Sequence, residues 1–173
     1  MPILRSAMAE RPNIFDPSWE REFSQGQFGL KGSSVARAAG SSKVGATLYE
    51  IPPGKKNLPY HFHHAVEELI IVLSGRLSLR TEEGERELAV GEVVACPVGP
   101  GGAHQLRNVG EEPARAIIAS SKADADFLIY PDSKKVQAMS GDFGSDDFSS
   151  MLVSTEPELG YFDGEPDAEE PSG

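Results

Sequence analysis

The stretch of residues 54–75 reads GKKNLPYHFHHAVEELIIVLSG and contains three of the four histidines of the chain. His61 and His63 are two positions apart, so on a β-strand both side chains point to the same face. Two imidazoles placed in this way can converge on one metal ion. Glu68 follows His63 by five positions, an odd separation that puts it on the opposite face of a continuous strand. We therefore expect a turn or bulge at residues 64–66 that brings the Glu68 carboxylate back toward the histidines.

The stretch of residues 91–108 reads GEVVACPVGPGGAHQLRN and carries the remaining histidine, His104. Its Gly- and Pro-rich part, residues 97–102, suits a tight bend that delivers the His104 side chain into the mouth of a barrel. Three imidazoles and one carboxylate form a mixed N/O donor set. Such a set suits one divalent ion of Mn, Fe, Co, Ni or Zn, and it does not suit calcium or the copper that prefers thiol ligands. A metal that prefers six ligands would keep two positions for water, O₂ or a bidentate substrate.

Short apolar runs surround these two stretches and predict β-strands. They recur every 8 to 12 residues, and each is closed by Gly, Pro or an acidic turn. Leu77, Leu79 and Thr81 alternate with polar residues, which is the period of a half-buried strand. The expected strands are 44–51, 60–63, 68–73, 76–81, 86–90, 93–96, 104–108 and 114–120. This spacing predicts an all-β antiparallel sandwich or barrel.

Both stretches resemble the sequence motifs of the cupin superfamily. The first has the order Gly, His61-x-His63, Glu68, Gly, and the second has Gly, Pro-x-Gly, His104, Asn108. The loops before His61 and His104 are longer than in the family pattern by one and two residues. The resemblance implies a jelly-roll barrel, the double-stranded β-helix of cupins, commonly dimeric, with His61, His63, Glu68 and His104 holding a metal deep in its mouth. The flanking sequence resembles a bacterial subgroup of single-domain cupins, some of whose members carry a sugar-phosphate isomerase name.

We expect three segments along the chain: an N-terminal arm and loop at 1–43, the cupin barrel at 44–130, and an acidic extension at 131–173 that is partly disordered. Residues 25–43 are rich in Gly, Ser and Ala and are predicted to be loop, with a short strand or turn at 35–39. Isolated apolar groups between residues 3 and 23 must cover the barrel or a neighbouring subunit, which favours a homodimer.

The sequence signals for secondary structure are weaker toward the C-terminus. Residues 125–130 are expected to form a strand, 134–139 a short strand or a turn, and 141–150 a loop. Tyr161 and Phe162 are expected to dock on the barrel, and residues 167–173 to be disordered.

Charge excludes several classes of partner. The net charge is −11, and residues 124–173 hold 13 acidic and 2 basic residues, against 14 of each before them. No basic footprint for nucleic acid or an anionic membrane exists. No apolar run has the length of a membrane span, the N-terminus has no secretory signal pattern, and the single cysteine, Cys96, excludes an internal disulfide. A cytoplasmic protein is therefore expected.

Several residues have a competing interpretation. Glu67 competes with Glu68 as the carboxylate ligand. His64 is expected to lie behind the metal ligands or on the surface, without binding the metal itself. Asn108 supports the pocket or forms a turn. Cys96 is expected to be a small buried side chain. Core packing is preferred for Tyr60 and Phe62, which flank His61.

The chemistry leaves three functions open. The first is a metal-dependent enzyme acting on a small organic molecule, with dioxygenase, decarboxylase or isomerase chemistry and with Glu68 as a proton acceptor. The second is a non-catalytic module that binds or senses a small ligand, and the third is a barrel that the metal merely stabilises. A sugar-phosphate isomerase needs a cationic phosphate site, for which the basic residues near the motifs are Lys55, Lys56, Arg76 and Arg107.

Overall fold

A computed structural model describes residues 11–141 and 145–165 of the chain, and these are nearly all β. The strands are β1 (Arg21–Gln25), β2 (Phe28–Ser33), β3 (Val44–Ile51), β4 (Phe62–His63), β5 (Glu68–Ser74), β6 (Leu77–Thr81), β7 (Gly84–Leu88), β8 (Val93–Cys96), β9 (Gln105–Asn108), β10 (Ala114–Ser121), β11 (Ala125–Tyr130), β12 (Lys135–Ser140) and β13 (Ser149–Ser154). One helical turn, α1 (Val35–Ala38), and a 3-10 turn (Pro100–Gly102) join them. The predicted all-β fold is confirmed.

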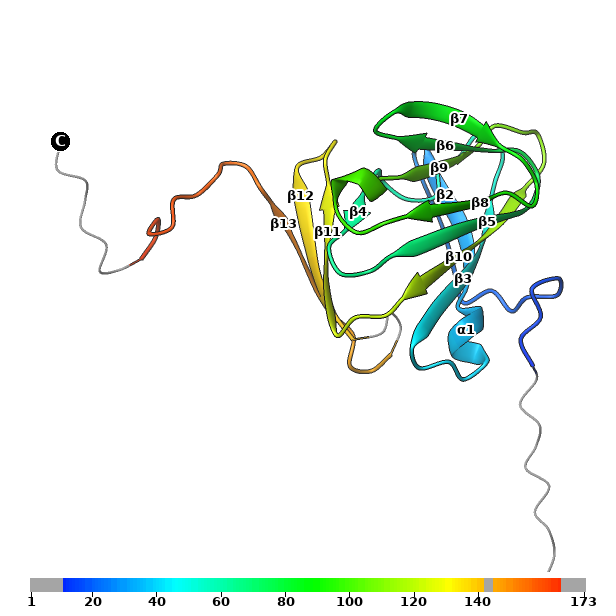
Figure 1. Cartoon of the computed structure of the whole chain (residues 1–173), viewed down its shortest axis with the longest axis horizontal. Coiled ribbons are helices and arrows are strands. Elements are labelled where there is room, and N and C mark those ends of the chain that lie inside the picture. Colours follow the sequence, from blue (N-terminus) through cyan, green and yellow to red (C-terminus); the bar gives the residue numbers. More distant parts are fainter. Residues whose placement is uncertain (1–10, 142–144, 166–173) are drawn as a thin grey trace, which may run out of the picture.

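The strands form three sheets around a common interior (Figure 1). The largest has the order β1-β2-β3-β10-β5-β8, the second β13-β12-β11-β4, and the third β7-β6-β9. Every strand pairing is antiparallel. Neighbours such as β10 and β3 lie far apart in sequence, so long connections bring them together, as in a jelly roll.

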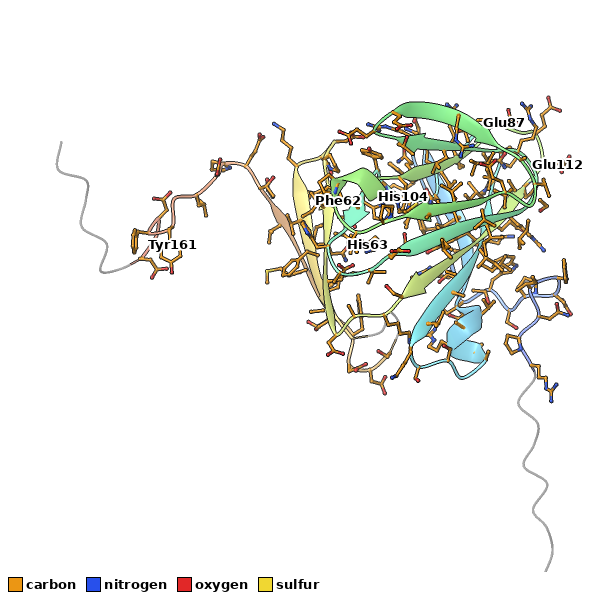
Figure 2. All side chains as sticks on the ribbon, in the orientation of Figure 1. Phe62, His63, Glu87, His104, Glu112 and Tyr161 are labelled. Atoms are coloured by element: carbon orange, nitrogen blue, oxygen red, sulfur yellow. The ribbon has the colours of Figure 1, made fainter. Side chains whose placement is uncertain are left out.

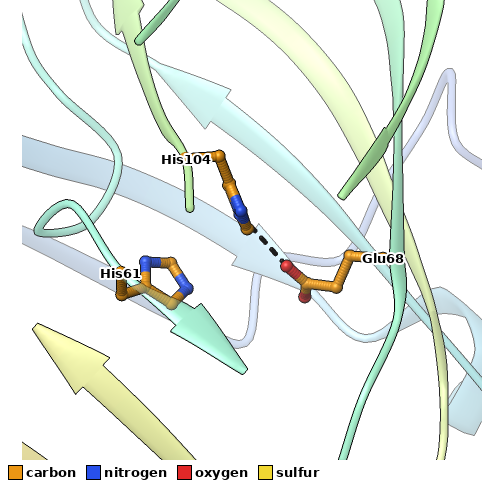
Figure 3. A group of neighbouring side chains, drawn as sticks. All are labelled: His61, Glu68 and His104. Atoms are coloured by element: carbon orange, nitrogen blue, oxygen red, sulfur yellow. Dashed lines mark ion pairs between the residues drawn. The ribbon is translucent and has the colours of Figure 1, made fainter. Parts of the chain in front are cut away.

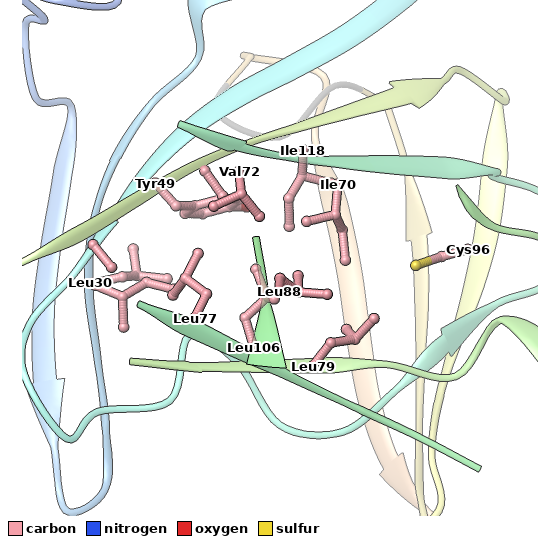
Figure 4. Close-up of a cluster of buried hydrophobic side chains, with 13 residues drawn as sticks. Leu30, Tyr49, Ile70, Val72, Leu77, Leu79, Leu88, Cys96, Leu106 and Ile118 are labelled. Atoms are coloured by element: carbon pink, nitrogen blue, oxygen red, sulfur yellow. The ribbon is translucent and has the colours of Figure 1, made fainter. Parts of the chain in front are cut away.

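The core fills the space between the largest and smallest sheets (Figure 4). Along β10, Ala114, Ala116 and Ile118 are buried while the residues between them are partly exposed, which is the alternation expected of a strand with one buried face. The largest fully buried apolar side chains are Leu30, Leu48, Ile51, Ile70, Val72, Leu77, Leu79 and Leu106.

The N-terminal part differs from the prediction that residues 25–43 are loop. Strands β1 and β2 form a hairpin, β2 pairs with β3, and α1 replaces the short strand or turn expected at 35–39. Glycines inside β2 conceal the strand pattern. Gly32 is buried under Arg21, where a side chain would collide with the arginine, so packing requires the glycine that reads as loop.

The C-terminal part extends the second sheet. The strand alternative at 134–139 is confirmed by β12, whereas β13 begins at Ser149, inside the expected loop. The expected docking of Tyr161 and Phe162 is wrong: their exposed fractions are 91% and 65%, their rings contact each other, and Tyr161 lies on a segment that leads away from the barrel (Figure 2). The expectations for Ile3, Leu4 and residues 167–173 fall outside the described residues.

Asn108 is a turn-forming residue buried to 0% exposure. Its side-chain amide donates to the carbonyl oxygens of Ile51 and Glu112 at 2.8 Å each, and its Oδ1 accepts from the Gly110 amide at 2.8 Å. The side chain therefore ties the end of β3 to the turn before β10.

Replacing Asn108 with Ala should destabilise the fold by about 2–4 kcal/mol, because buried backbone groups would lose their partners. Urea unfolding followed by circular dichroism measures this. The neighbouring exposed Arg107→Ala should change the unfolding free energy by less than about 0.5 kcal/mol. An equally small effect of Asn108→Ala would contradict the structural role assigned to it.

Candidate metal centre

Two antiparallel segments bring His61 and His104 together. The His61 amide donates to the His104 carbonyl at 3.3 Å, and the His104 amide donates to the His61 carbonyl at 2.9 Å. The buried Asn57, four residues before His61, pairs with Leu106 in a similar way. Its backbone amide donates to the Leu106 carbonyl, and its Oδ1 accepts from the Leu106 amide, at 3.0 Å each. This local ladder fixes the spacing of the two imidazoles, whose ring centroids are 4.7 Å apart.

Glu68 enters the site from the first position of β5, where the prediction placed it. The chain bends at His64 and Ala65, as the odd separation from His63 required. Figure 3 shows the Glu68 carboxylate facing His104, with the His61 ring beside them. Among the described residues, His61, Glu68 and His104 form a group that could hold a metal ion, with one ligand atom from each lying within 4.8 Å of the others.

His63 stands beside this group rather than within it. Its Nε2 is 3.5 Å from Glu68 Oε2, while His104 Nε2 is 3.1 Å from the same oxygen. The His63 ring centroid is 5.2 Å from that of His61. The structure therefore brings all four predicted residues to one place, but only three of them satisfy the tighter spacing.

Each of the three imidazoles is held by its Nδ1. His61 Nδ1 donates to the Pro59 carbonyl at 2.8 Å, and His104 Nδ1 donates to the Gly102 carbonyl at 2.9 Å. His63 Nδ1 lies 2.5 Å from Asp126 Oδ2. Because carbonyl and carboxylate oxygens only accept, the Nδ1 atoms carry the hydrogens, and in the neutral rings each Nε2 keeps a lone pair for a metal.

Asp126 is a functional residue that sequence reasoning missed. Its second oxygen accepts the amides of His64 at 3.2 Å and Ala65 at 2.8 Å, so one carboxylate orients His63 and also holds the bend that returns Glu68. Burial alone would raise the pKa of Asp126, but its hydrogen bonds to His63 and Ala65 lower it below the usual range. The available signal was an acidic residue at an inward-facing position of the correctly predicted strand β11.

The charges at the site are unequal. Burial, reinforced by His104, lowers the pKa of His61 to about 4, so this ring is neutral at pH 7. Burial would also lower the pKa of His104, but contacts with Cys96 and Glu68 raise it to about 10. Burial would raise the pKa of Glu68, but its close contact with His104 and the charge of His63 hold that pKa below its usual range.

The donor atoms fit a divalent cation. His63 Nε2, Glu68 Oε2 and His104 Nε2 are buried and make no hydrogen bond within the described residues. A neutral His104 would turn a lone pair toward the carboxylate oxygen 3.1 Å away, and such a pair is favourable only with a proton or a metal ion between the two atoms. Nitrogen and oxygen donors together suit first-row transition metals.

The other residues with competing interpretations are not among the grouped ligand candidates. Glu67 and His64 are exposed, so the preference for Glu68 agrees with the structure. Tyr60 and Phe62 are buried in a small cluster with Ala103, which confirms the core interpretation. Cys96 is buried in the main core, at the edge of the metal centre.

A cavity of about 560 Å³ opens at this centre, within the usual range of small-molecule sites. His61, His63, Glu68 and Asp126 line one part of it. Three basic side chains also line it: Arg21, Arg37 and Lys122. The sequence analysis did not point to any of these three residues. The four basic residues that it did name near the motifs, Lys55, Lys56, Arg76 and Arg107, are not among the lining residues.

The comparisons with known proteins agree with this β-barrel fold. A family model described as the cupin domain matches residues 47–120. A provisionally named sugar phosphate isomerase from Acidithiobacillus ferrooxidans is 30% identical, with 73% of this chain and 77% of that chain covered and a TM-score of 0.63. The chain belongs to the cupin superfamily.

Two further solved structures share the fold. A sugar phosphate isomerase of the cupin superfamily from Silicibacter pomeroyi is 22% identical, with 74% of this chain and 78% of that one covered and a TM-score of 0.67. The polyketide cyclase RemF from Streptomyces resistomycificus is 23% identical, with coverages of 66% and 80% and a TM-score of 0.53. Among curated proteins, none matches the sequence. The described residues include no helix with the length and apolar character of a membrane span.

Replacing Asp126 with Ala should weaken metal binding by about 10- to 100-fold, because the His63 ring would lose the partner that orients it. Competition with a chelator of known affinity measures the change. Asp124→Ala removes an exposed carboxylate one residue before β11 and is the matched control. Equal affinities for the two variants would show that Asp126 does not position a ligand.

Proposed function

We propose that this cupin is a mononuclear transition-metal enzyme acting on a small organic molecule. His61, His63, Glu68 and His104 would hold the ion, which is one of Mn, Fe, Co, Ni or Zn. The observation that carries the proposal is the set of three imidazoles, each with its Nδ1 bound to an oxygen, gathered around a buried carboxylate. Oriented rings with available Nε2 atoms are the arrangement that a metal ligand needs.

A bound metal would supply Lewis acidity or a site for O₂ and a chelating substrate. The residues of the chain do the remaining work. The lowered pKa of Glu68 keeps it ionised at neutral pH, which lets it balance the charge of the ion and makes it a candidate proton acceptor. Asp126 fixes His63 and the bend that carries the chain to Glu68. Apolar side chains of the cavity, such as Leu30, Leu58 and Leu128, would surround the carbon skeleton of the substrate.

Dioxygenase, decarboxylase and isomerase chemistry all remain compatible with this centre. Isomerisation of a sugar phosphate gains support from the name given to the 30% identical relative and from the basic residues of the cavity. A non-catalytic ligand-binding role would use the same metal and the same cavity. Turnover of a bound ligand by the metal-loaded protein is the measurement that distinguishes these two functions.

The expected homodimer and cytoplasmic location remain predictions. Exposed apolar residues at the N-terminal side, Phe15 and Phe23, are compatible with a subunit contact. Sedimentation equilibrium would give the mass of the assembly.

The metal is tested by elemental analysis of protein purified without chelator. We expect about one equivalent of a single transition metal in the native protein and its loss in the His61→Ala/His63→Ala variant, because two of the expected ligands would be gone. Glu68→Gln should also lower the metal content.

Glu67→Gln is the matched control, since it makes the same change at the exposed neighbour and should keep the metal. Circular dichroism shows whether each variant is folded. A native protein that takes up no metal, even after anaerobic reconstitution, would refute the proposed enzyme.

A further inference from the structure

The acidic side chains that line the cavity contact histidines of the candidate metal centre, and the other charged lining residues are basic. Its carboxylates are Glu68 and Asp126, and both are committed to histidines of the metal centre. The other charged lining residues are Arg21, Arg37 and Lys122, all of them basic. The excess negative charge of the chain lies in residues 124–173, and of the acidic residues there Asp126 lines the cavity.

Arg21 is built into the cavity wall. It lies in one row across three strands, paired with Gly32 on β2, which is paired in turn with Tyr49 on β3. Its guanidinium donates to the Tyr49 hydroxyl at 2.9 Å and lies 5.3 Å from the centre of the Tyr49 ring. A Cβ on Gly32 would stand 2.4 Å from Arg21 Nε, so the missing side chain is what lets the arginine lie across β2.

Tyr49, which accepts the hydrogen bond from Arg21, lines the same cavity as Glu68. Burial raises the pKa of the Tyr49 phenol, the Arg21 charge opposes the rise, and the Glu68 charge adds to it. The phenol is therefore within the electrostatic reach of both groups. Arg21, Tyr49 and Glu68 all line the same cavity, so one small molecule in it would face both the cation and the metal ligands.

We propose that the cavity binds a small organic anion, with its acid group at Arg21 and Lys122 and its hydroxyl or carbonyl oxygens at the metal centre. The second half of this statement rests on the proposed function. A carboxylate and a phosphate share the chemistry that a guanidinium recognises, since both accept paired hydrogen bonds. Arg37, whose guanidinium contacts Glu20 at 2.7 Å, lines the same cavity.

The test compares glucose, glucuronate and glucose 6-phosphate, titrated by calorimetry into the metal-loaded protein. These probes share one sugar scaffold and differ in their acid group: none, a carboxylate and a phosphate. We expect at least one of the two anions to bind about tenfold more tightly than glucose, and Arg21→Gln to remove most of that preference. The anion that binds identifies the acid group.

Two further variants sharpen the test. Gly32→Ala keeps every charge but places a Cβ against Arg21, so it should also weaken the preference if the position of the guanidinium matters. Arg107→Gln removes a positive charge at an exposed position outside the cavity lining and should leave binding unchanged. Thermal unfolding shows whether each variant is folded. If Gly32→Ala does not fold, the result for Arg21→Gln alone decides the test.

Equal binding of the three sugars, no binding of any of them, or an anion preference that survives Arg21→Gln would each overturn the anion site. The metal content is measured first, and the titrations are repeated on metal-free protein. If the chain binds no metal but still prefers an anion through Arg21, the proposed enzyme fails and the anion site stands.

Discussion

The buried Glu68 carboxylate is the constraint on which the rest of the structure depends. Two imidazole nitrogens approach one of its oxygens, His104 Nε2 at 3.1 Å and His63 Nε2 at 3.5 Å. A carboxylate removed from water is stable only beside positive charge, which here is a proton on an imidazole or a metal ion. The hydrogen bonds that hold the Nδ1 atoms decide that the opposite nitrogens face this carboxylate.

The barrel supplies this arrangement through few contacts. The paired amides of His61 and His104 and the corresponding contacts of Asn57 with Leu106 hold two segments in register. Asp126 fixes the position of His63, because its two oxygens hold both the His63 ring and the amides of the adjacent bend. Backbone pairing and one carboxylate thus hold the candidate metal ligands in place, so the lengths of the loops before His61 and His104 can differ from the family pattern without moving these residues apart.

The cavity beside the candidate metal centre is also lined by charged side chains from distant parts of the chain. Its carboxylates contact the histidines of the candidate metal centre, whereas its cations come from β1, from α1 and from the residue after β10. The barrel fold itself is shared with proteins of different names, an isomerase and a cyclase among them, so the fold does not select the reaction. Under the proposed function, selection of a substrate would rest on the side chains that line the cavity, among them Arg21, which is held by Tyr49 and lies against Gly32.

The sequence by itself determined the strands of the central barrel and the metal-ligand candidates, because both depend on short-range spacing. A strand places residues two apart on one face, so the alternation of apolar residues and the pair His61 and His63 could be recognised without coordinates. The ends of β3, β8 and β11 match the predicted ranges for the same reason.

Tertiary structure alone decided which distant residues complete the site. Asp126 is 63 positions from His63, and Arg21 is 28 positions from Tyr49, and no local period relates such pairs. The hairpin of β1 and β2 remained hidden in part because Gly32 packs against Arg21, a contact that exists only once the strands are side by side. Strand pairing across long connections is set by the burial of whole faces, and this collective property fixed the contents of the cavity.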